Sequence, residues 1–274
     1  MSTRTPPRTP APRTASSRTL APRMADYWWT VYKRTWKGSV VSSFVTPLLY
    51  VVAMGVLLGG FIQGDPDQLE GATTYLAFVV PGMLAAQSMQ LVFGELTYPV
   101  MSGVKWHKTY FAMTATPLAV RDVVQSQVAF VLFRVALTSA VFCLVVAPFG
   151  VFATWWGALL AFLVQPLVAL AFATPVFALS AHLKDETGFS LVFRLGMIPM
   201  FLFSGAFFPV ANLSPVLEVL ARLTPLWHGV DLTRMLTVDR FDPLLALVHV
   251  AYLVGLAALG YVLVLRFLGR RLAS

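Results

Sequence analysis

Long apolar runs separated by short polar segments dominate the chain from residue 40 onward. Six of these runs approach or exceed the roughly 20 residues that an α-helix needs to cross a bilayer. They cover residues 40–62, 73–93, 124–147, 155–181, 189–208 and 243–265. The segments between them contain the Pro, Gly and charged residues that end helices. The pattern predicts an all-α membrane protein with six transmembrane helices.

The first 38 residues have a different pattern. Residues 1–23 are almost entirely Pro, Arg, Thr, Ser and Ala without the apolar core of a signal peptide, which predicts a disordered basic tail. Residues 24–38 would form a helix with an aromatic face opposite a cationic one, as in an interfacial helix that lies among lipid head groups. The alternative is a solvated first turn of the next span. The residues that define the two faces are Trp28, Tyr32, Trp36, Lys33 and Arg34.

Residues 209–242 are too interrupted to span a membrane. Ser214 precedes Pro215 and Thr224 precedes Pro225, which is the order of an N-cap residue and the first residue of a helix. We expect two short half-helices that re-enter the outer face of the membrane. Irregular backbone at that depth is tolerated only against protein or water, so this region would line an interface or a cavity.

The basic residues predict the orientation. Sixteen of the twenty Lys and Arg lie in residues 1–37, 94–121, 182–194 and 266–274, whereas the opposite side would hold three, Arg222, Arg234 and Arg240. Because cytoplasmic loops carry an excess of Lys and Arg, both termini are expected in the cytoplasm. The same clustering beside an anionic membrane surface explains the net charge of +8 without nucleic-acid binding.

The composition argues against several further classes of protein and site. The chain is 58% hydrophobic and 12% charged, against about 25% charged in soluble domains. The single Cys143 and the four scattered His residues predict neither a disulfide nor a metal site, and the histidines are expected to be structural. We expect no catalytic residues, because paired carboxylates are missing from the apolar runs. No Gly-Lys dipeptide occurs, so a Walker A loop is missing and any ATP would be bound by another subunit.

Three places could carry chemistry, each with a plainer alternative. Residues 104–118 combine basic and aromatic residues that a soluble partner could grip, or they form an ordinary loop. Arg134, inside an apolar run, would face the bundle interior or extend toward the membrane surface, and Arg194 is read in the same way. Residues 199–209 place small residues, which allow close helix approach, beside phenylalanines that would form a gate or a lipid-facing surface.

At these places the chain resembles the permease subunits of type-2 ABC exporters, in particular the nodulation-factor (lipo-oligosaccharide) and daunorubicin-resistance branches. The stretch Val104-Lys-Trp-His-Lys-Thr-Tyr-Phe-Ala-Met-Thr-Ala-Thr-Pro-Leu118 is the most specific similarity. Residues 199–209 and 225–234 are similar to segments that recur across the superfamily. The long tail departs from the family, and so does the Trp227-His228 pair, where small or hydroxylated residues are commoner.

The resemblance implies a bacterial cytoplasmic-membrane exporter for an amphipathic molecule such as a glycolipid, lipo-oligosaccharide or lipophilic antibiotic. Residues 39–274 would form the transmembrane domain and pair with a second copy and with two ATPase subunits that bind ATP and Mg²⁺. The segment 95–117 would couple to the ATPase, which the interfacial helix would also touch. The implied coupling residues are Glu95, Lys105, Trp106, His107, Lys108, Thr109 and Tyr110, and the outer gate would contain Phe203, Phe207 and Phe208.

Two other functions remain open from the sequence. A membrane scaffold or anchor would have the same spans without a transport path. A small intramembrane lipid-modifying enzyme would need polar side chains that converge inside the bundle, and the sequence offers few of them.

Overall fold

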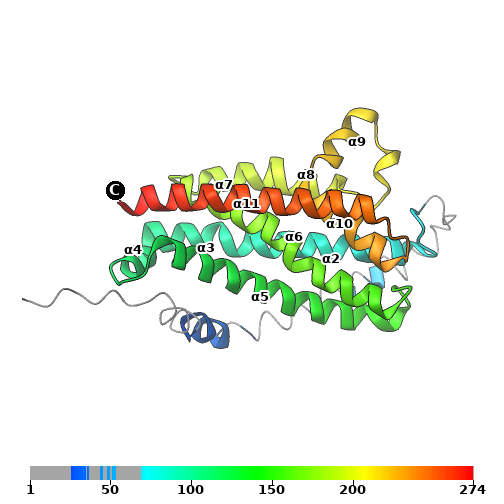
Figure 1. Cartoon of the computed structure of the whole chain (residues 1–274), viewed down its shortest axis with the longest axis horizontal. Coiled ribbons are helices and arrows are strands. Elements are labelled where there is room, and N and C mark those ends of the chain that lie inside the picture. Colours follow the sequence, from blue (N-terminus) through cyan, green and yellow to red (C-terminus); the bar gives the residue numbers. More distant parts are fainter. Residues whose placement is uncertain are drawn as a thin grey trace, which may run out of the picture.

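The computed structural model describes residues 26–34, 36, 44–45, 48–49, 51–53 and 69–273. The predicted tail and most of the first predicted span therefore lie outside the described residues. The described part is helical, without strands. Its longest helices are α2 (Tyr75–Leu96), α5 (Val120–Val146), α6 (Trp155–His182) and α11 (Pro243–Ala273). Figure 1 shows these four lying side by side along the long axis of the molecule.

Shorter elements complete the described chain. α2 continues through α3 (Tyr98–Met101) and η2 (Ser102–Trp106), and α4 (Thr109–Thr114) then turns back beside them. A segmented helix follows α6, and two short helices lie before α11. With η3, which follows α5, and η5, which precedes α9, the remaining short elements in chain order are η3 (Ala147–Phe149), α7 (Thr187–Val192), η4 (Phe193–Met197), α8 (Ile198–Phe203), η5 (Val210–Asn212), α9 (Pro215–Arg222) and α10 (Pro225–Thr237).

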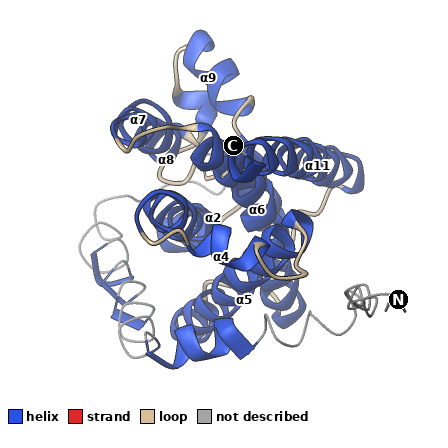
Figure 2. Cartoon of the chain, turned by 90° about the vertical axis from the view of Figure 1, so that its left-hand side faces the viewer, coloured by secondary structure: helices blue, strands red, loops and turns tan. Residues whose placement is uncertain are grey.

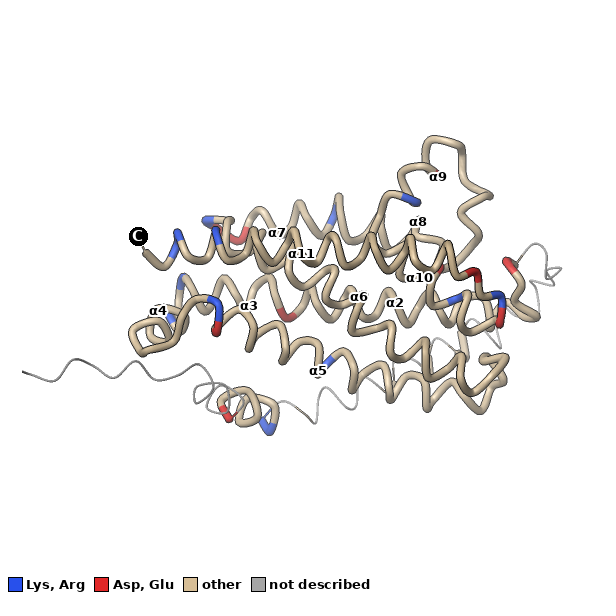
Figure 3. The backbone as a smooth tube through the Cα atoms, in the orientation of Figure 1, with Lys and Arg blue, Asp and Glu red and all other residues tan. Residues whose placement is uncertain are grey.

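Four helical stretches are long and apolar enough to cross a membrane: Tyr75–Lys105, Val120–Phe149, Trp155–His182 and Pro243–Ala273. The stretch Thr187–Phe203 is a shorter apolar helix. Charged residues gather mainly near the two ends of the bundle (Figure 3). We call the end that carries α4 and the C-terminus the hairpin end, and the end that carries α9 and α10 the far end (Figure 1).

The helix α6 forms the centre of the bundle. It packs against α2, α5, α10 and α11, and Figure 2 shows it enclosed by its neighbours. In the apolar window of the α2 stretch 78% of the residues are buried, against 28% in α11. Because a soluble protein rarely leaves such a large apolar surface exposed, the outer face of α11 is suited to lipid or to a second membrane-embedded surface.

Small residues set the closest helix contacts. A Cβ atom on Gly260 of α11 would lie 2.5 Å from the backbone nitrogen of Pro175 in α6. Beside this contact, Thr174 donates a hydrogen bond to the carbonyl of Ala257, 2.8 Å away. Close backbone approach with hydroxyl-to-carbonyl bonding is typical of helix pairs in membranes, where apolar burial alone gives little attraction.

A buried polar node joins α2, α6 and α10. The Gln165 side chain is fully buried and accepts a hydrogen bond from Ser88, 3.0 Å away. Its amide nitrogen donates to Thr233 at 3.2 Å and to the carbonyl of Ala161 at 2.9 Å. Because buried polar groups need partners, this arrangement fixes which faces of the three helices meet.

The described helix boundaries agree with the predictions in part. The fourth apolar run matches α6 within one residue. The second run continues as helix to Lys105 rather than ending at residue 93, because Thr97 bonds the Phe93 carbonyl at 2.6 Å and buries its hydroxyl. The fifth run ends at Phe203 rather than residue 208, because the following residues form a non-helical loop in which Gly205 has φ of 82°.

The two expected half-helices are present as α9 and α10, which begin at Pro215 and Pro225. Thr224 caps α10 by accepting a hydrogen bond from the Trp227 backbone at 3.3 Å, whereas Ser214 makes no such bond. Figure 1 shows α9 standing apart from the bundle at the far end.

Candidate functional site

A helical hairpin at one end of the bundle contains most of the predicted coupling residues. The chain reverses at Lys108, whose φ of 51° is left-handed, and α4 begins at the next residue. Ser102 Oγ and His107 Nδ1 lie 2.6 Å apart just before the reversal. Four residues around the reversal are exposed: Lys105, Trp106, His107 and Lys108. The hairpin therefore presents a basic and aromatic tip.

Tyr110 anchors this tip to the bundle. The side chain is 5% exposed, and its hydroxyl donates a hydrogen bond to Gln127 Oε1 of α5, 3.3 Å away. Its ring lies over Gly103, where a Cβ atom would come within 2.9 Å of it. Burial raises the pKa of Tyr110, so the hydroxyl stays protonated as a donor. The neighbouring Thr109 is half-buried.

A second polar segment at the hairpin end contacts the tip. Lys105 Nζ lies 2.9 Å from a carboxylate oxygen of Glu186, in the turn between α6 and α7. The hydrogen bond from Lys105 lowers the pKa of the Glu186 carboxyl. The rings of Tyr98 and Phe189 also meet, with centroids 5.1 Å apart. An exposed ion pair contributes little stability, so this pair only orients Lys105 toward the turn, and the tip depends mainly on Tyr110 for its position.

Glu95 lies away from the exposed tip. It belongs to α2 and forms an ion pair with Arg134 of α5, with side chains 23% and 17% exposed respectively. The structure thus places the Arg134 side chain against a carboxylate inside the bundle. Pairing reduces the cost of placing either charge within an apolar helix.

The described part of the N-terminal helix, residues 26–34, packs its aromatic face on α5. Trp28 stacks on Phe130 with centroids 4.5 Å apart, and Tyr32 meets Phe133 edge-on at 5.6 Å. The cationic positions and the next aromatic residue are exposed: Lys33, Arg34 and Trp36. Trp28 and Tyr32 of the predicted aromatic face therefore pack on α5, whereas Trp36 of that face is exposed like the cationic residues.

The N-terminal helix, the end of α2, the hairpin and α5 surround a cavity of about 320 Å³. Glu95 and Arg134 line it together with Trp28 from the N-terminal helix and Tyr110 from the hairpin. The structure thereby brings residues of the predicted coupling segment next to residues of the predicted interfacial helix.

The predicted gate residues lie in or beside the loop after α8. Phe207 meets Phe201 edge-on at 5.0 Å, and its carbonyl accepts a hydrogen bond from Tyr75 at 3.0 Å. Phe203 is exposed and Phe208 is half-buried. Among the described ring contacts, none joins the three predicted phenylalanines to one another. The small residues of this loop pack internally instead, because Ala206 fills the space beside Gly82 of α2.

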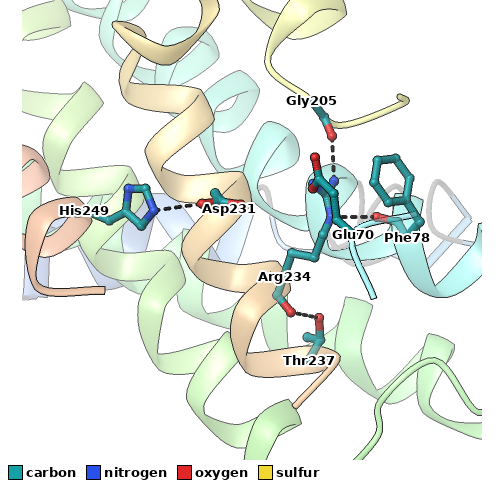
Figure 4. A network of polar contacts seen from close by, with 7 residues as sticks. All are labelled: Glu70, Phe78, Gly205, Asp231, Arg234, Thr237 and His249. Atoms are coloured by element: carbon teal, nitrogen blue, oxygen red, sulfur yellow. Dashed lines mark hydrogen bonds and ion pairs between the residues drawn. The ribbon is translucent and has the colours of Figure 1, made fainter. Parts of the chain in front are cut away.

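Arg234 connects this loop to two other elements (Figure 4). Its guanidinium donates to the Gly205 carbonyl at 2.5 Å and to the Phe78 carbonyl at 3.3 Å, and it pairs with Glu70 at 2.5 Å. It also lies 3.9 Å from the centroid of the Phe78 ring. The residue is 3% exposed. A planar group with five donors suits this geometry, since it bonds several acceptors at once.

Two histidines meet between α10 and α11. His228 Nδ1 and His249 Nδ1 are 2.7 Å apart, and His249 Nε2 is 2.9 Å from Asp231. The Tyr252 ring stacks on His228 at 3.9 Å. Figure 4 shows His249 and Asp231 on the other side of α10 from the Arg234 contacts. Two of the four histidines are therefore paired rather than scattered.

The sequence contained a weak signal for both clusters. His228, Asp231 and Arg234 recur every three residues within the otherwise apolar helix α10, which is the spacing of neighbours on a helix. Their partners at positions 70, 205 and 249 are distant in the chain, so local patterns do not reveal them.

Taken together, the four long apolar helices and the end-weighted charges define a multi-pass helical membrane protein. Residues 24–238 match the family model described as ABC-2 type transporter. The chain therefore belongs to the ABC-2 type transporter family, whose members are the membrane component of transporters.

The similar proteins share one name. Nodulation protein J of Rhizobium leguminosarum bv. trifolii is 30% identical over 214 residues, which are 76% of this chain and 79% of that protein. Nodulation protein J of Sinorhizobium fredii is 29% identical over 254 residues, or 90% and 94% of the two chains. The Bradyrhizobium diazoefficiens protein of that name is 26% identical over 260 residues, or 92% and 97%. No solved structure matches the chain.

Proposed function

We propose that this chain is the transmembrane permease of an ABC exporter that moves an amphipathic molecule across the bacterial cytoplasmic membrane. Two copies would pair with two copies of a separate ATPase subunit, which would bind ATP and Mg²⁺. Both termini would lie in the cytoplasm, so that the hairpin end faces the ATPase. The observation that carries the proposal is the exposed tip Lys105–Lys108, which Tyr110 and Glu186 hold in place.

This tip has the properties that mechanical coupling requires. Its exposed side chains can enter a cleft of a soluble partner, whereas Tyr110 at its base is fixed to α5. Within the tip, Lys105 pairs with Glu186 of the α6–α7 turn. A push on such a tip is passed to packed helices, since well-packed interiors deform little. Residues 26–34, on α5, would form the second contact with the ATPase.

Co-purification with the ATPase subunit, followed by measurement of ATP hydrolysis, tests the coupling. Trp106→Ala and Lys108→Glu should each reduce the stimulation of ATP hydrolysis by the permease. Arg240→Glu, the same charge reversal at an exposed position of the far end, should leave it unchanged. Normal stimulation in both tip variants would contradict the coupling assignment and favour a scaffold without transport.

The proposed path for the cargo runs between α2 and the α7–α8 segment of each permease. The loop that follows α8 would form the outer gate, with Phe203, Phe207 and Phe208 as its apolar residues. Its position against α2, through Tyr75 and Gly82, supports this role. Apolar side chains suit a lipid-linked saccharide, a glycolipid or a lipophilic drug, since each has an apolar portion.

Export from cells tests the gate. Phe207→Ala should change the export rate, because this ring lies in the loop and packs back on Phe201 of α8. Phe203→Ala and Phe208→Ala complete the set. Normal export by all three variants, at unchanged protein levels, would remove the gate assignment while leaving the coupling hypothesis intact.

A further inference from the structure

The cavity at the hairpin end is lined in part by residues of the predicted coupling segment, Glu95 and Tyr110 among them, but neither the proposed coupling nor the proposed gate requires a ligand there. It lies between residues 26–34 and the ends of α2 and α5, and its volume of about 320 Å³ is within the range of small-ligand pockets, roughly 300–1,000 Å³. Its walls combine aromatic, amide, hydroxyl and charged groups. The composition is therefore that of a site for a polar group attached to an apolar body.

The charges that line the cavity are balanced. Among its described lining residues, Glu95 and Arg134 alone belong to the Asp, Glu, Lys and Arg types, and they form an ion pair. A lone phosphate would be attracted by the guanidinium but repelled by the carboxylate. A lone ammonium would be attracted by the carboxylate but repelled by the guanidinium. A group with both charges matches both residues at once.

Trp28 supplies a donor without a partner. Its indole Nε1 atom is buried and makes no hydrogen bond within the described part of the chain, and the residue lines the cavity. Buried indole N–H groups usually find an acceptor. The ring itself is held by stacking on Phe130, at 4.5 Å. A ligand oxygen that reaches this atom from the cavity would complete its hydrogen bond.

The location indicates that the ligand comes from the bilayer. Glu95 and Arg134 lie within two of the apolar helices that can cross a membrane, while Trp28 belongs to a helix with an aromatic face and an exposed cationic one. Trp and Tyr concentrate at the depth of lipid head groups. We propose that the cavity binds the head group of a zwitterionic phospholipid, with the ammonium at Glu95 and the phosphate at Arg134 and the Trp28 indole.

Native mass spectrometry of the purified full-length permease tests the proposal, with phosphatidylethanolamine and phosphatidylglycerol as probes. The wild type should retain phosphatidylethanolamine about tenfold more strongly, since one charged hydrogen-bonded contact distinguishes the lipids. Glu95→Gln should abolish this preference and Arg134→Gln should weaken both lipids. Arg194→Gln, which removes an exposed cation outside the cavity, should change neither.

Trp28→Phe keeps an aromatic ring to stack on Phe130 and removes the N–H group with part of the indole, and it leaves both charges in place, so it also serves if the charge variants fail to fold. It should weaken phosphatidylethanolamine binding about threefold to tenfold. Equal retention of the two lipids by the wild type, or unchanged binding by Trp28→Phe, would overturn the proposal. Displacement by octyl glucoside at matched concentration would also overturn it, in favour of a neutral sugar head group. The measurement needs neither ATPase nor export, so its result is independent of the exporter proposal.

Discussion

His228 Nδ1 and His249 Nδ1 lie 2.7 Å apart, and one proton between them serves both rings. If both rings carried a proton on Nδ1, two donors would face each other. Asp231 accepts from the far side of His249, at 2.9 Å, and offsets a single positive charge only. The pair therefore fastens α10 to α11 most firmly when at least one ring is neutral.

Acidification should weaken this connection. The nearby titratable or charged groups are Asp231 and Arg234 on α10, Tyr252 on α11 and Arg222 on α9. Burial lowers the pKa of His228 to about 4, so its neutral ring contributes stability that is lost as the pH falls from about 6.5 toward 4. We expect the thermal unfolding temperature in detergent to fall over that range. His228→Ser should remove much of this pH dependence. If that variant kept the same pH profile, the histidine pair would not be the cause of the pH dependence.

Replacement of Arg234 should destabilise the protein strongly. Arg234→Met leaves Glu70 and two carbonyls without their donor, and loss of one partner from a buried ion pair costs about 3–5 kcal/mol. Arg234→Lys should recover only part of this, because a point charge cannot bond all three acceptors. Denaturation followed by far-ultraviolet circular dichroism measures the change.

The matched control is Arg222→Gln. Arg222 is exposed and pairs with Glu218 one turn earlier in α9, at 2.7 Å. Such pairs contribute about 0.3–0.5 kcal/mol, so stability should hardly change. A similar loss in both variants would mean that burial of Arg234 does not matter.

At position 165 the polarity and charge of the side chain should affect the stability of the protein more than its volume does. Gln165→Leu should cost about 1 kcal/mol or less, because both partners keep a backbone acceptor in their own helix, Ser88 at Leu84 and Thr233 at Gly229. Gln165→Glu should cost about 3 kcal/mol or more at neutral pH, since it buries a charge without a cation. Equal unfolding temperatures for the two variants would contradict this account of the node.

The sequence predicted most of the described helices, but it did not predict the side-chain contacts between them. The extent of α6 follows from its uninterrupted apolar run, and the starts of α9 and α10 follow from Pro215 and Pro225. These are local properties. The partner of Arg134 is 39 residues away and that of His228 is 21 residues away, and which partner a charged or aromatic group finds depends on helix packing. Hence the class of protein could be predicted, whereas the cavity and the far-end clusters could not.

The contact between α6 and α11 offers the most direct test of the packing, because α11 contains two glycines with opposite surroundings. A Cβ atom on Gly260 would lie 2.5 Å from both the Pro175 nitrogen and the Thr174 hydroxyl, whereas one on Gly255 would meet nothing within 4 Å. Gly260→Ala should therefore force the helices apart and cost about 1–3 kcal/mol. Gly255→Ala adds a better helix former at an open position and should stabilise the protein by up to about 1 kcal/mol. The measurement is the unfolding temperature of the two variants in the same detergent. If the Gly255 variant lost as much stability as the Gly260 variant, α11 would not pack on α6 through this face.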